Sequence, residues 1–281
     1  MMRFGVVIVG DEILSGRRTD KHLTKVIELL TTRGLELSWA QYVGDDRDAI
    51  AAVLTRTFAS DDVVFVTGGI GATPDDQTRQ AAAQARGVAV ALHPEAAELI
   101  RKRILKMNAE SDHPLPPDQV DASPEHRQRM RMGEFPVGAG IVPNPYNQIP
   151  GFSIERHYFV PGFPVMAWPM LEWVLETHYA DLFHHAPRAE RSVLVFDVPE
   201  SRVTPLMERI EEDFADVRVF SLPSVGDATA VGHADAQVAL RADRHIELGV
   251  KGPRAAIDPA FAALEAGLTA LAARFVRVDP A

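Results

Sequence analysis

VVFVTGGIGATPDDQTRQA, the stretch from Val63 to Ala81, decides the fold of this chain. Its first residues, up to Thr67, are β-branched or aromatic and predict a strand buried on both faces. Three glycines, at positions 68, 69 and 71, then predict a tight turn before a helix-forming stretch. The order of strand, glycine-rich turn and helix is typical of α/β domains whose turn contacts a ligand.

The turn after this strand also carries two adjacent carboxylates, Asp75 and Asp76. Glycines let backbone N–H groups approach an anion, and a helix N-terminus adds a partial positive charge. We expect Thr73 and Pro74 to open that helix, because proline is favoured in the first helical turn. Adjacent carboxylates repel a bare phosphate unless a divalent cation lies between them. The turn therefore predicts a site for a phosphorylated ligand together with a metal ion.

Composition excludes several classes of function. The 281 residues are enough for one large or two ordinary domains. A net charge of -10 leaves no basic surplus for a phosphate backbone, so we do not expect nucleic acid as a partner. Without cysteine, the chain has no disulfide, catalytic thiolate or Cys-based metal site. The apolar run at the N-terminus is too short for a signal peptide or membrane span, so we expect a cytoplasmic protein without membrane contact.

Strands alternate with helices along the first half of the chain. Arg3–Val9 and Leu35–Val43 are expected strands, and Thr19 is expected to cap the helix between them. Two later segments, Gly140–Pro145 and His157–Val160, are expected to complete the same sheet. The alternation predicts an α/β domain with a mostly parallel sheet between two layers of helices, a three-layer sandwich.

Two regions depart from this alternation. Residues 108–135 contain four prolines and little apolar periodicity, which predicts an irregular excursion or lid. From residue 191 a new pattern begins, with strands expected near Val217, Gln237 and His245. We therefore expect two domains, a first over residues 1–185 and a smaller α+β domain over residues 186–281.

Acidic residues follow three of the expected strands. They are Asp11 and Glu12, Asp45 and Asp46, and Asp75 and Asp76. The carboxyl ends of parallel strands meet at one edge of the sheet, where ligands bind in open α/β folds. Metal ligation, binding of ribose hydroxyls and activation of water are all compatible with acids there. The alternative is that the acids only cap the helices that follow them.

Four segments together resemble a known family. TGGIGATPDDQT is similar to the TGG-x-G-x-T-x-DD-x-T pattern of the molybdopterin-binding domain superfamily. The opening GDEILSGRRTDKH and the later segments NPYNQIPGF and VPGFPVM resemble its competence/damage-inducible CinA-like branch. The resemblance covers residues 3–175 and implies a three-layer domain whose cleft at the strand ends holds a nucleotide or a pterin phosphate.

The resemblance also implies chemistry and site residues. Bacterial members of the CinA-like branch are linked to metal-dependent hydrolysis of ADP-ribose or related dinucleotides, whereas molybdopterin-handling relatives bind or adenylylate the pterin. The implied ligand-binding residues are Thr67, Gly68, Gly69, Gly71, Thr73, Glu12, Asn144, Gly151, Pro161 and Gly162. We expect catalytic roles for Asp76, Asp45 and Asp11, and ligation of magnesium, manganese or cobalt by Asp75 and Asp76.

The chain departs from the family pattern at Ala72, Asn147, Gln148 and Met166, where the family has proline, glycine, threonine and glutamate. These changes leave three hypotheses open: a nucleotide pyrophosphatase, a molybdopterin or pterin-phosphate binding protein without hydrolysis, and a non-catalytic oligomeric scaffold. Residues 186–281 stand where the family has a KH-like domain, and we interpret them as structural or oligomerising. Nothing resembles the deamidase domain of many CinA-like proteins, so deamidation is not expected. The family leads us to expect a homo-oligomer.

Overall fold

The computed structural model describes residues 2–185, 188–231 and 239–278. The chain divides into two compact units, Met1–Phe183 and His184–Ala281. Each unit has its own hydrophobic core and is described by itself below.

The first unit is built on a six-stranded sheet in the order β2-β1-β3-β8-β7-β6. The strands are β1 (Phe4–Val9), β2 (Leu37–Val43), β3 (Val63–Thr67), β6 (Gly140–Val142), β7 (Gly151–Ile154) and β8 (His157–Val160). β1 pairs in parallel with β2 and β3, and β3 pairs in parallel with β8. β7 runs antiparallel to both of its neighbours. The mostly parallel sheet predicted from the sequence is confirmed.

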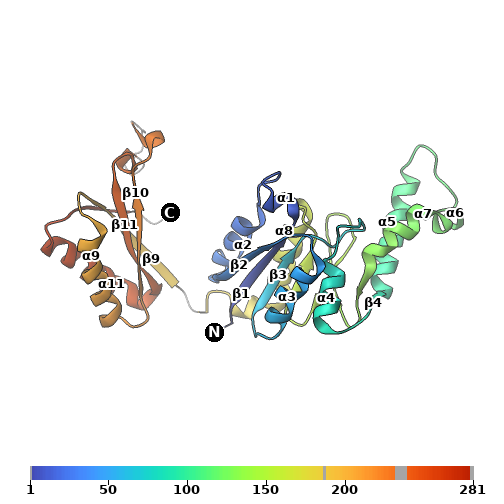
Figure 1. Cartoon of the computed structure of the whole chain (residues 1–281), viewed down its shortest axis with the longest axis horizontal. Helices are drawn as coiled ribbons and strands as arrows, with labels where there is room; N and C mark the ends of the chain where they lie inside the picture. Colours follow the sequence, from blue (N-terminus) through green and yellow to red (C-terminus); the bar gives the residue numbers. More distant parts are fainter. Residues whose placement is uncertain (1, 186–187, 232–238, 279–281) are drawn as a thin grey trace. The chain divides into compact units, whose positions relative to one another are not determined.

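Helices cover both faces of this sheet (Figure 1). They are α1 (Asp11–Leu14), α2 (His22–Thr31), α3 (Arg47–Phe58), α4 (Thr78–Arg86), α5 (Pro94–Ala109) and α8 (Pro164–His178), followed by η2 (Ala180–Leu182). In β1, Val6 and Ile8 share a core with α2 and α8, whereas Val7 and Val9 share a core with α3, α4 and α5. Because neighbouring strand residues point to opposite faces, β1 is apolar throughout and both faces are covered. The three-layer architecture is thus confirmed.

The N-terminus of α2 is capped differently from the prediction. The carboxylate of Asp20 accepts hydrogen bonds from the N–H groups of His22 and Leu23 at 2.8 and 3.1 Å, so the expectation that Thr19 caps this helix was wrong. Asp20 lies two residues before His22, where its short side chain folds back onto the first free amides of the helix.

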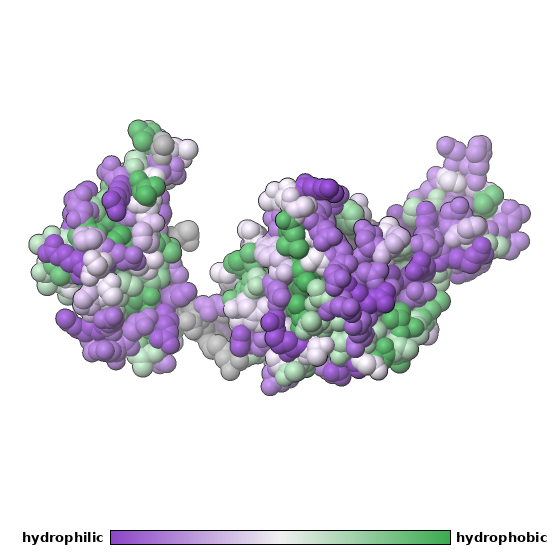
Figure 2. Space-filling view, in the orientation of Figure 1, coloured by the Kyte–Doolittle hydropathy of each residue, from purple (hydrophilic) through white to green (hydrophobic). Residues whose placement is uncertain are grey.

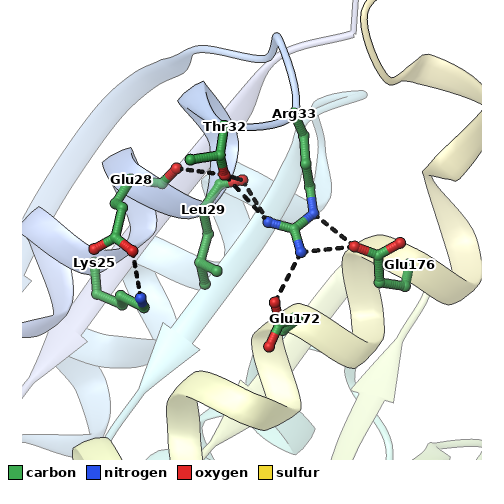
Figure 3. Close-up of polar contacts among 7 residues, drawn as sticks. All are labelled: Lys25, Glu28, Leu29, Thr32, Arg33, Glu172 and Glu176. Atoms are coloured by element: carbon green, nitrogen blue, oxygen red, sulfur yellow. Dashed lines mark hydrogen bonds and ion pairs between the residues drawn. The ribbon is translucent and has the colours of Figure 1, made fainter. Parts of the chain in front are cut away.

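The C-terminal end of α2 is tied to α8 by Arg33 (Figure 3). Its guanidinium donates to Glu172 and Glu176 at 3.0 and 2.6 Å and to the carbonyl of Leu29 at 2.9 Å. The Arg33 side chain is only 12% exposed, so this network is better shielded than an isolated surface pair, which contributes at most about 1 kcal/mol. The two helices are therefore fixed side by side, and the segments at their N-terminal ends enclose a cavity described below.

Residues 108–135 are more regular than the sequence indicates. The chain forms α6 (Pro117–Ala122), α7 (Pro124–Met130) and the short helix η1 (Arg131–Gly133), so the prediction of an irregular excursion was wrong. Pro117 and Pro124 occupy the first helical positions, where a missing N–H has no cost, and therefore begin helices instead of breaking them. β4 (Val90–Leu92) and β5 (Glu134–Pro136) close the base of this excursion as an antiparallel pair. Figure 2 shows mostly hydrophilic residues over α5 to α7.

The second unit is an antiparallel sheet in the order β10-β11-β9-β12 with two helices packed on it. Its elements are β9 (Arg188–Phe196), α9 (Glu200–Asp213), β10 (Arg218–Ser224), η3 (Ala228–Ala230), η4 (Leu240–Ala242), β11 (His245–Pro253), α11 (Arg254–Ala270) and β12 (Arg274–Arg277). A smaller α+β region is confirmed, although the expected strand near Gln237 lies outside the described residues. An oligomerising role for it stays a prediction.

Within the described part of the chain, no helix combines the length and apolarity that crossing a membrane requires.

A buried histidine makes the stability of the first unit depend on pH. His157, in β8, is 1% exposed, and its Nε2 lies 2.9 Å from the Thr57 hydroxyl. Its ring centroid lies 4.0 Å from that of Phe58. Burial, assisted by the charge of Arg86, lowers the pKa of His157 from 6.5 to about 4.

We expect the first unit to lose about 2 kcal/mol of stability between pH 7.5 and pH 5 through this group. The unfolded chain binds the proton below about pH 6.5 while native His157 stays neutral down to about pH 4, so stability falls as pH is lowered through this window. Urea unfolding followed by tryptophan fluorescence measures it, since all three tryptophans lie in this unit. His157→Gln should flatten the dependence. His113→Gln, at an exposed position, should not, and an unchanged slope in His157→Gln would contradict the assignment.

Candidate functional site

The carboxyl ends of the parallel strands β1, β2, β3 and β8 meet at one edge of the sheet. The segments that leave this edge are residues 10–14, 44–46, 68–77 and 161–163. They contain almost all of the residues that the sequence predicts for the site, as expected for an open α/β sheet.

The glycine loop, residues 68–73, packs directly on the elements around it. Gly68 and Gly69 have φ angles of 98° and 68°, in the left-handed region that favours glycine. A Cβ at Gly68 would lie 2.3 Å from the carbonyl oxygen of Val9, and one at Gly69 would lie 2.2 Å from the hydroxyl of Thr78. The loop therefore has room only for glycine at these two positions.

Asp76 organises the same loop from its far end. Its carboxylate accepts hydrogen bonds from the N–H groups of Gly71 and Thr73, at 2.9 and 2.8 Å, and from the Thr73 hydroxyl. These bonds fold residues 73–77 into a turn, so the helix begins at Thr78 and the expectation that Pro74 opens it was wrong. The carboxylate oxygens of Asp76 are thus engaged inside the loop.

Backbone N–H groups of the glycine loop fall into two sets. Gly68 donates to the carbonyl of Val160 at 3.0 Å and Gly71 donates to Asp76, so both are already used. In the described residues, no partner is found for the N–H groups of Gly69, Ile70 and Ala72. Those three amides are the ones that an anion can bind.

Side chains of α4 and α7 hold the glycine loop, and α4 is in turn tied to the segment 108–135. Arg79, only 1% exposed, donates to the carbonyls of Gly71 and Arg131, and Gln128 donates to the carbonyl of Ala72. Burial lowers the pKa of the Arg79 guanidinium, and the charges of Glu134 and Asp76 act in the opposite direction. Since the carbonyls of Gly71 and Ala72 are held by side chains of α4 and α7, this part of the loop backbone is fixed in place.

Four carboxylates form an acidic cluster at the ends of β1, β2 and β3. Its members are Asp11, Glu12, Asp45 and Asp75. The N–H of Asp11 donates to Asp45 at 2.9 Å and the N–H of Asp45 donates to Asp11 at 3.3 Å. Burial raises the pKa of Asp45, and the charges of the other three members raise it further, although the bond from Asp11 lowers it.

The structure separates the roles of Asp45 and Asp46. Asp46 caps α3, because its carboxylate accepts a hydrogen bond from the N–H of Ala49 at 2.8 Å. Asp45 makes no such cap and instead joins the acidic cluster. The capping interpretation therefore applies to Asp46 alone.

A cavity of about 360 Å³, the glycine-loop cavity, opens beside the loop. Predicted residues that line it are Gly69, Gly71, Thr73, Asp76, Asn144, Pro161 and Gly162. Sequence reasoning missed its apolar walls, which are formed by Ile70, Met132, Ile149, Pro150 and Phe163. All of them except Met132 lie inside the family-like segments, but the sequence reasoning gave these apolar side chains no role, and the fold brings them together.

Two of the departures from the family pattern touch each other in the wall of this cavity. Asn147 donates from Nδ2 to the sulfur of Met166 at 3.2 Å, and its Oδ1 accepts from Asn144 at 2.8 Å and from the N–H of Ile149 at 2.9 Å. Asn144 is 4% exposed and also donates to the carbonyl of Ile149. Where the family has a glutamate, this chain has Met166, and the Asn147 amide, itself a departure from the family pattern, contacts the Met166 sulfur.

A second cavity of about 360 Å³, the α2–α8 cavity, lies at the N-terminal ends of α2 and α8. It is lined by the predicted residues Glu12, Thr67 and Gly162 and by Arg18, Thr19, Lys21, His22, Phe163 and Pro164, which the sequence reasoning did not assign. Gly162 and Phe163 border both cavities. Besides the three predicted residues, the segment GRRTDKH supplies Arg18, Thr19, Lys21 and His22 to this cavity.

Gly151 does not join the site. It lies in β7, where a Cβ would be 2.2 Å from the carbonyl of Phe159, and it lines neither cavity. Asp11, Asp45 and Asp75 line neither cavity but belong to the acidic cluster.

Comparison with known families identifies the family of the first unit. Residues 5–181 match the family described as probable molybdopterin binding domain. The chain belongs to this family. Among curated proteins, a CinA-like protein of Citrifermentans bemidjiense is 30% identical to it over 211 residues. This alignment covers 74% of this chain and 47% of the relative. The chain is 30% identical over 223 residues to one of Anaeromyxobacter dehalogenans, covering 78% and 51%.

These relatives confirm the resemblance to the CinA-like branch, and the chain spans about half the length of each. The crystal structure of a CinA protein of unknown function from Thermoplasma acidophilum is similar with a TM-score of 0.51 and 24% identity. That similarity covers 62% of this chain and 97% of the other, and it supports the fold of the molybdopterin-binding domain.

We expect Gly68→Ala to destabilise the first unit by roughly 3 kcal/mol or more. The new Cβ would clash with the Val9 backbone, and the positive φ angle adds strain for any residue other than glycine. Gly138→Ala is the matched control. Gly138 has a φ of 89° with nothing within 4 Å of a Cβ, so only strain of about 1–2 kcal/mol is expected. Urea unfolding of both variants tests this, and equal losses would show that the loop does not pack on β1.

Proposed function

We propose that this chain is a metal-dependent nucleotide pyrophosphatase that hydrolyses ADP-ribose or a related dinucleotide. The observation that carries the proposal is the acidic cluster beside a glycine loop with unpaired N–H groups. The amides suit the oxygens of a diphosphate, and the crowded carboxylates suit a divalent cation. The CinA-like resemblance implies the same chemistry.

The donor set fits a cation that is shared with the substrate. Throughout the described ranges, no three His, Asp or Glu side chains are placed to hold a metal ion by themselves. Magnesium and similar ions are commonly held by one or two carboxylates plus phosphate oxygens and water. Asp75, which is exposed, is the carboxylate we assign to this role. When bound, the cation neutralises the diphosphate and polarises the phosphorus.

The chain's own residues account for the remaining steps. A water oxygen bonds to one phosphorus, the bridging P–O bond breaks, and the bridging oxygen leaves with the electron pair on the other phosphate. From ADP-ribose this gives AMP and ribose 5-phosphate. A carboxylate of the cluster accepts the water proton, and we assign this to Asp45 because its raised pKa makes it the stronger base. Free amides at Gly69, Ile70 and Ala72 stabilise charge on the phosphate oxygens.

Asp11 and Asp76 support this arrangement. Asp11 holds Asp45 through its N–H, and Asp76 holds the loop amides in position through its contacts with Gly71 and Thr73. The direct catalytic roles of Asp11 and Asp76, and metal ligation by Asp76, stay predictions.

A second candidate function is binding of molybdopterin or another pterin phosphate without hydrolysis. It is favoured by the glycine-loop cavity, whose apolar walls and exposed Phe163 suit a planar ring. The family to which residues 5–181 belong is described as a probable molybdopterin binding domain, which agrees with such a ligand.

We expect incubation with ADP-ribose and magnesium, manganese or cobalt to release AMP, and a chelator to abolish the release. Asp45→Asn should lower the rate at least about 100-fold, because it removes the base. Asp46→Asn is the matched control, since it removes the adjacent charge while asparagine still caps α3, and it should stay within about threefold of the unchanged chain. Chromatography of the nucleotide products measures all three rates.

Absence of AMP from ADP-ribose, FAD and related dinucleotides with every metal would refute the pyrophosphatase proposal. Tight binding of a pterin phosphate that survives the chelator would then favour the second candidate. Equal loss of rate in Asp46→Asn and Asp45→Asn would contradict the role assigned to Asp45. If nucleotides and pterins both failed to raise the melting temperature, the non-catalytic scaffold would remain.

A further inference from the structure

A cavity of about 490 Å³, the α9 cavity, lies within the second unit. It opens where β9 and β10 end and where α9 and β11 begin. Its apolar lining is formed by Val195, Val198, Pro223, Val225 and Ile246. Apolar walls around a few polar groups are the usual composition of a site for a small molecule. The polar groups of this cavity therefore indicate which molecule it suits.

His245 offers an unpaired ring nitrogen to the α9 cavity. The residue is 5% exposed, and its Nδ1 lies 2.7 Å from the carbonyl oxygen of Asp243. A carbonyl only accepts, so Nδ1 carries the proton and Nε2 of the neutral ring is an acceptor. Nε2 has no partner in the described residues and, unlike the enclosed Nδ1 of His157, keeps accessible surface. A ligand in the cavity that carries an N–H or O–H donor can therefore pair with it.

Two carboxylates line the same cavity. Asp197 pairs with Arg274 at 3.2 Å through one oxygen, and Glu200 accepts the hydroxyl of Ser221 at 2.6 Å through one oxygen. In the part of the chain that the structure describes, the other oxygen of each carboxylate has no partner. An ammonium group has three N–H donors and no acceptor. Two carboxylates and a ring nitrogen that accepts are a set of partners that suits it.

The α9 cavity also has groups that suit a carboxylate. Arg244 lines it, is exposed and has no ion-pair partner among the described residues. Glu200 is the first residue of α9, a helix that no side chain caps, and its N–H finds no partner in the described ranges. A guanidinium binds a carboxylate through two parallel hydrogen bonds, and a helix N-terminus favours negative charge.

This distribution of charge suits a zwitterion better than a phosphate. A phosphate monoester carries a charge of about -1.5 to -2 at neutral pH, and Asp197 and Glu200 would repel it. A zwitterion instead places its positive group against these two acids and its negative group against Arg244. The apolar walls then remain for a hydrocarbon side chain.

We propose that the α9 cavity binds a free α-amino acid with an aliphatic side chain. The ammonium group donates to Nε2 of His245 and to the carboxylates of Asp197 and Glu200. The carboxylate accepts from the guanidinium of Arg244 and from the N–H of Glu200, and the side chain packs on the apolar walls. All of these groups belong to the second unit, so the site does not depend on the proposed pyrophosphatase function.

Calorimetry of the full chain with L-leucine and two of its analogues tests the ligand class. Isoamylamine lacks the carboxylate of leucine, and isocaproate lacks its ammonium group. We expect leucine to bind, and each analogue to bind at least about tenfold more weakly, because each loses one set of charged hydrogen bonds. Failure of leucine, isoleucine and valine to bind would overturn the proposal, as would equal affinity for leucine and either analogue.

Arg244→Ala tests the carboxylate contact, with Arg209→Ala as the matched control. Arg209 is an exposed arginine of α9 that does not line the cavity. We expect Arg244→Ala to weaken leucine about tenfold and to leave isoamylamine unchanged, since isoamylamine has no carboxylate. Arg209→Ala should change neither affinity. An equal loss in both variants, or no loss in Arg244→Ala, would contradict the assignment.

Asp197→Asn tests the ammonium contact. Asp197 has a φ of 59°, a conformation that asparagine also adopts, so the variant should keep the backbone and melt close to the unchanged chain. We expect it to bind leucine about fivefold more weakly and isocaproate no less tightly. Asp213→Asn, at the exposed last residue of α9, is the matched control and should have no effect. Unchanged affinity for leucine in Asp197→Asn would overturn the ammonium site.

Discussion

The close approach of the glycine loop to the end of β1 is the contact on which the site depends. At Gly68 the Val9 carbonyl occupies the space where a side chain would begin, so the loop lies flat against the sheet edge. Asp76 and Arg79 then hold its amides and carbonyls from two sides. The N–H groups of Gly69, Ile70 and Ala72 remain without a partner in the described residues, in a loop whose other contacts fix its backbone.

Charge around this edge is divided in a way that suits a large anionic ligand. The acidic cluster gathers at the ends of β1 and β2, whereas Arg18 and Lys21 stand without ion pairs, within the described residues, at the α2–α8 cavity. An acidic chain repels phosphates at long range, so binding requires a bound cation, local basic groups, or both. Glu12 belongs to the acidic cluster and also lines the α2–α8 cavity, so the two regions are adjacent.

Much of the fold follows from local pattern. The apolar strands β1 and β3, the helices between them and the change of pattern near residue 190 were predictable, because burial on both faces leaves a continuous apolar run. Errors arose where single side chains decide local geometry. Asp76 folds a turn where Pro74 suggested a helix start, and Pro117 and Pro124 begin helices in a segment expected to be irregular.

The sequence by itself determined the family, the parallel sheet and the glycine loop with its acids, because spacing along the chain sets strand ends and turns. Only the tertiary structure decided which acids act together. Asp45 and Asp46 are adjacent and chemically identical, yet one joins Asp11 and the other caps α3. It also brought the His22 ring to the carbonyl of Gly162, although 140 positions separate them, and both residues line the α2–α8 cavity. Side-chain direction and contacts between distant segments depend on how the layers pack, and packing is a property of the whole domain.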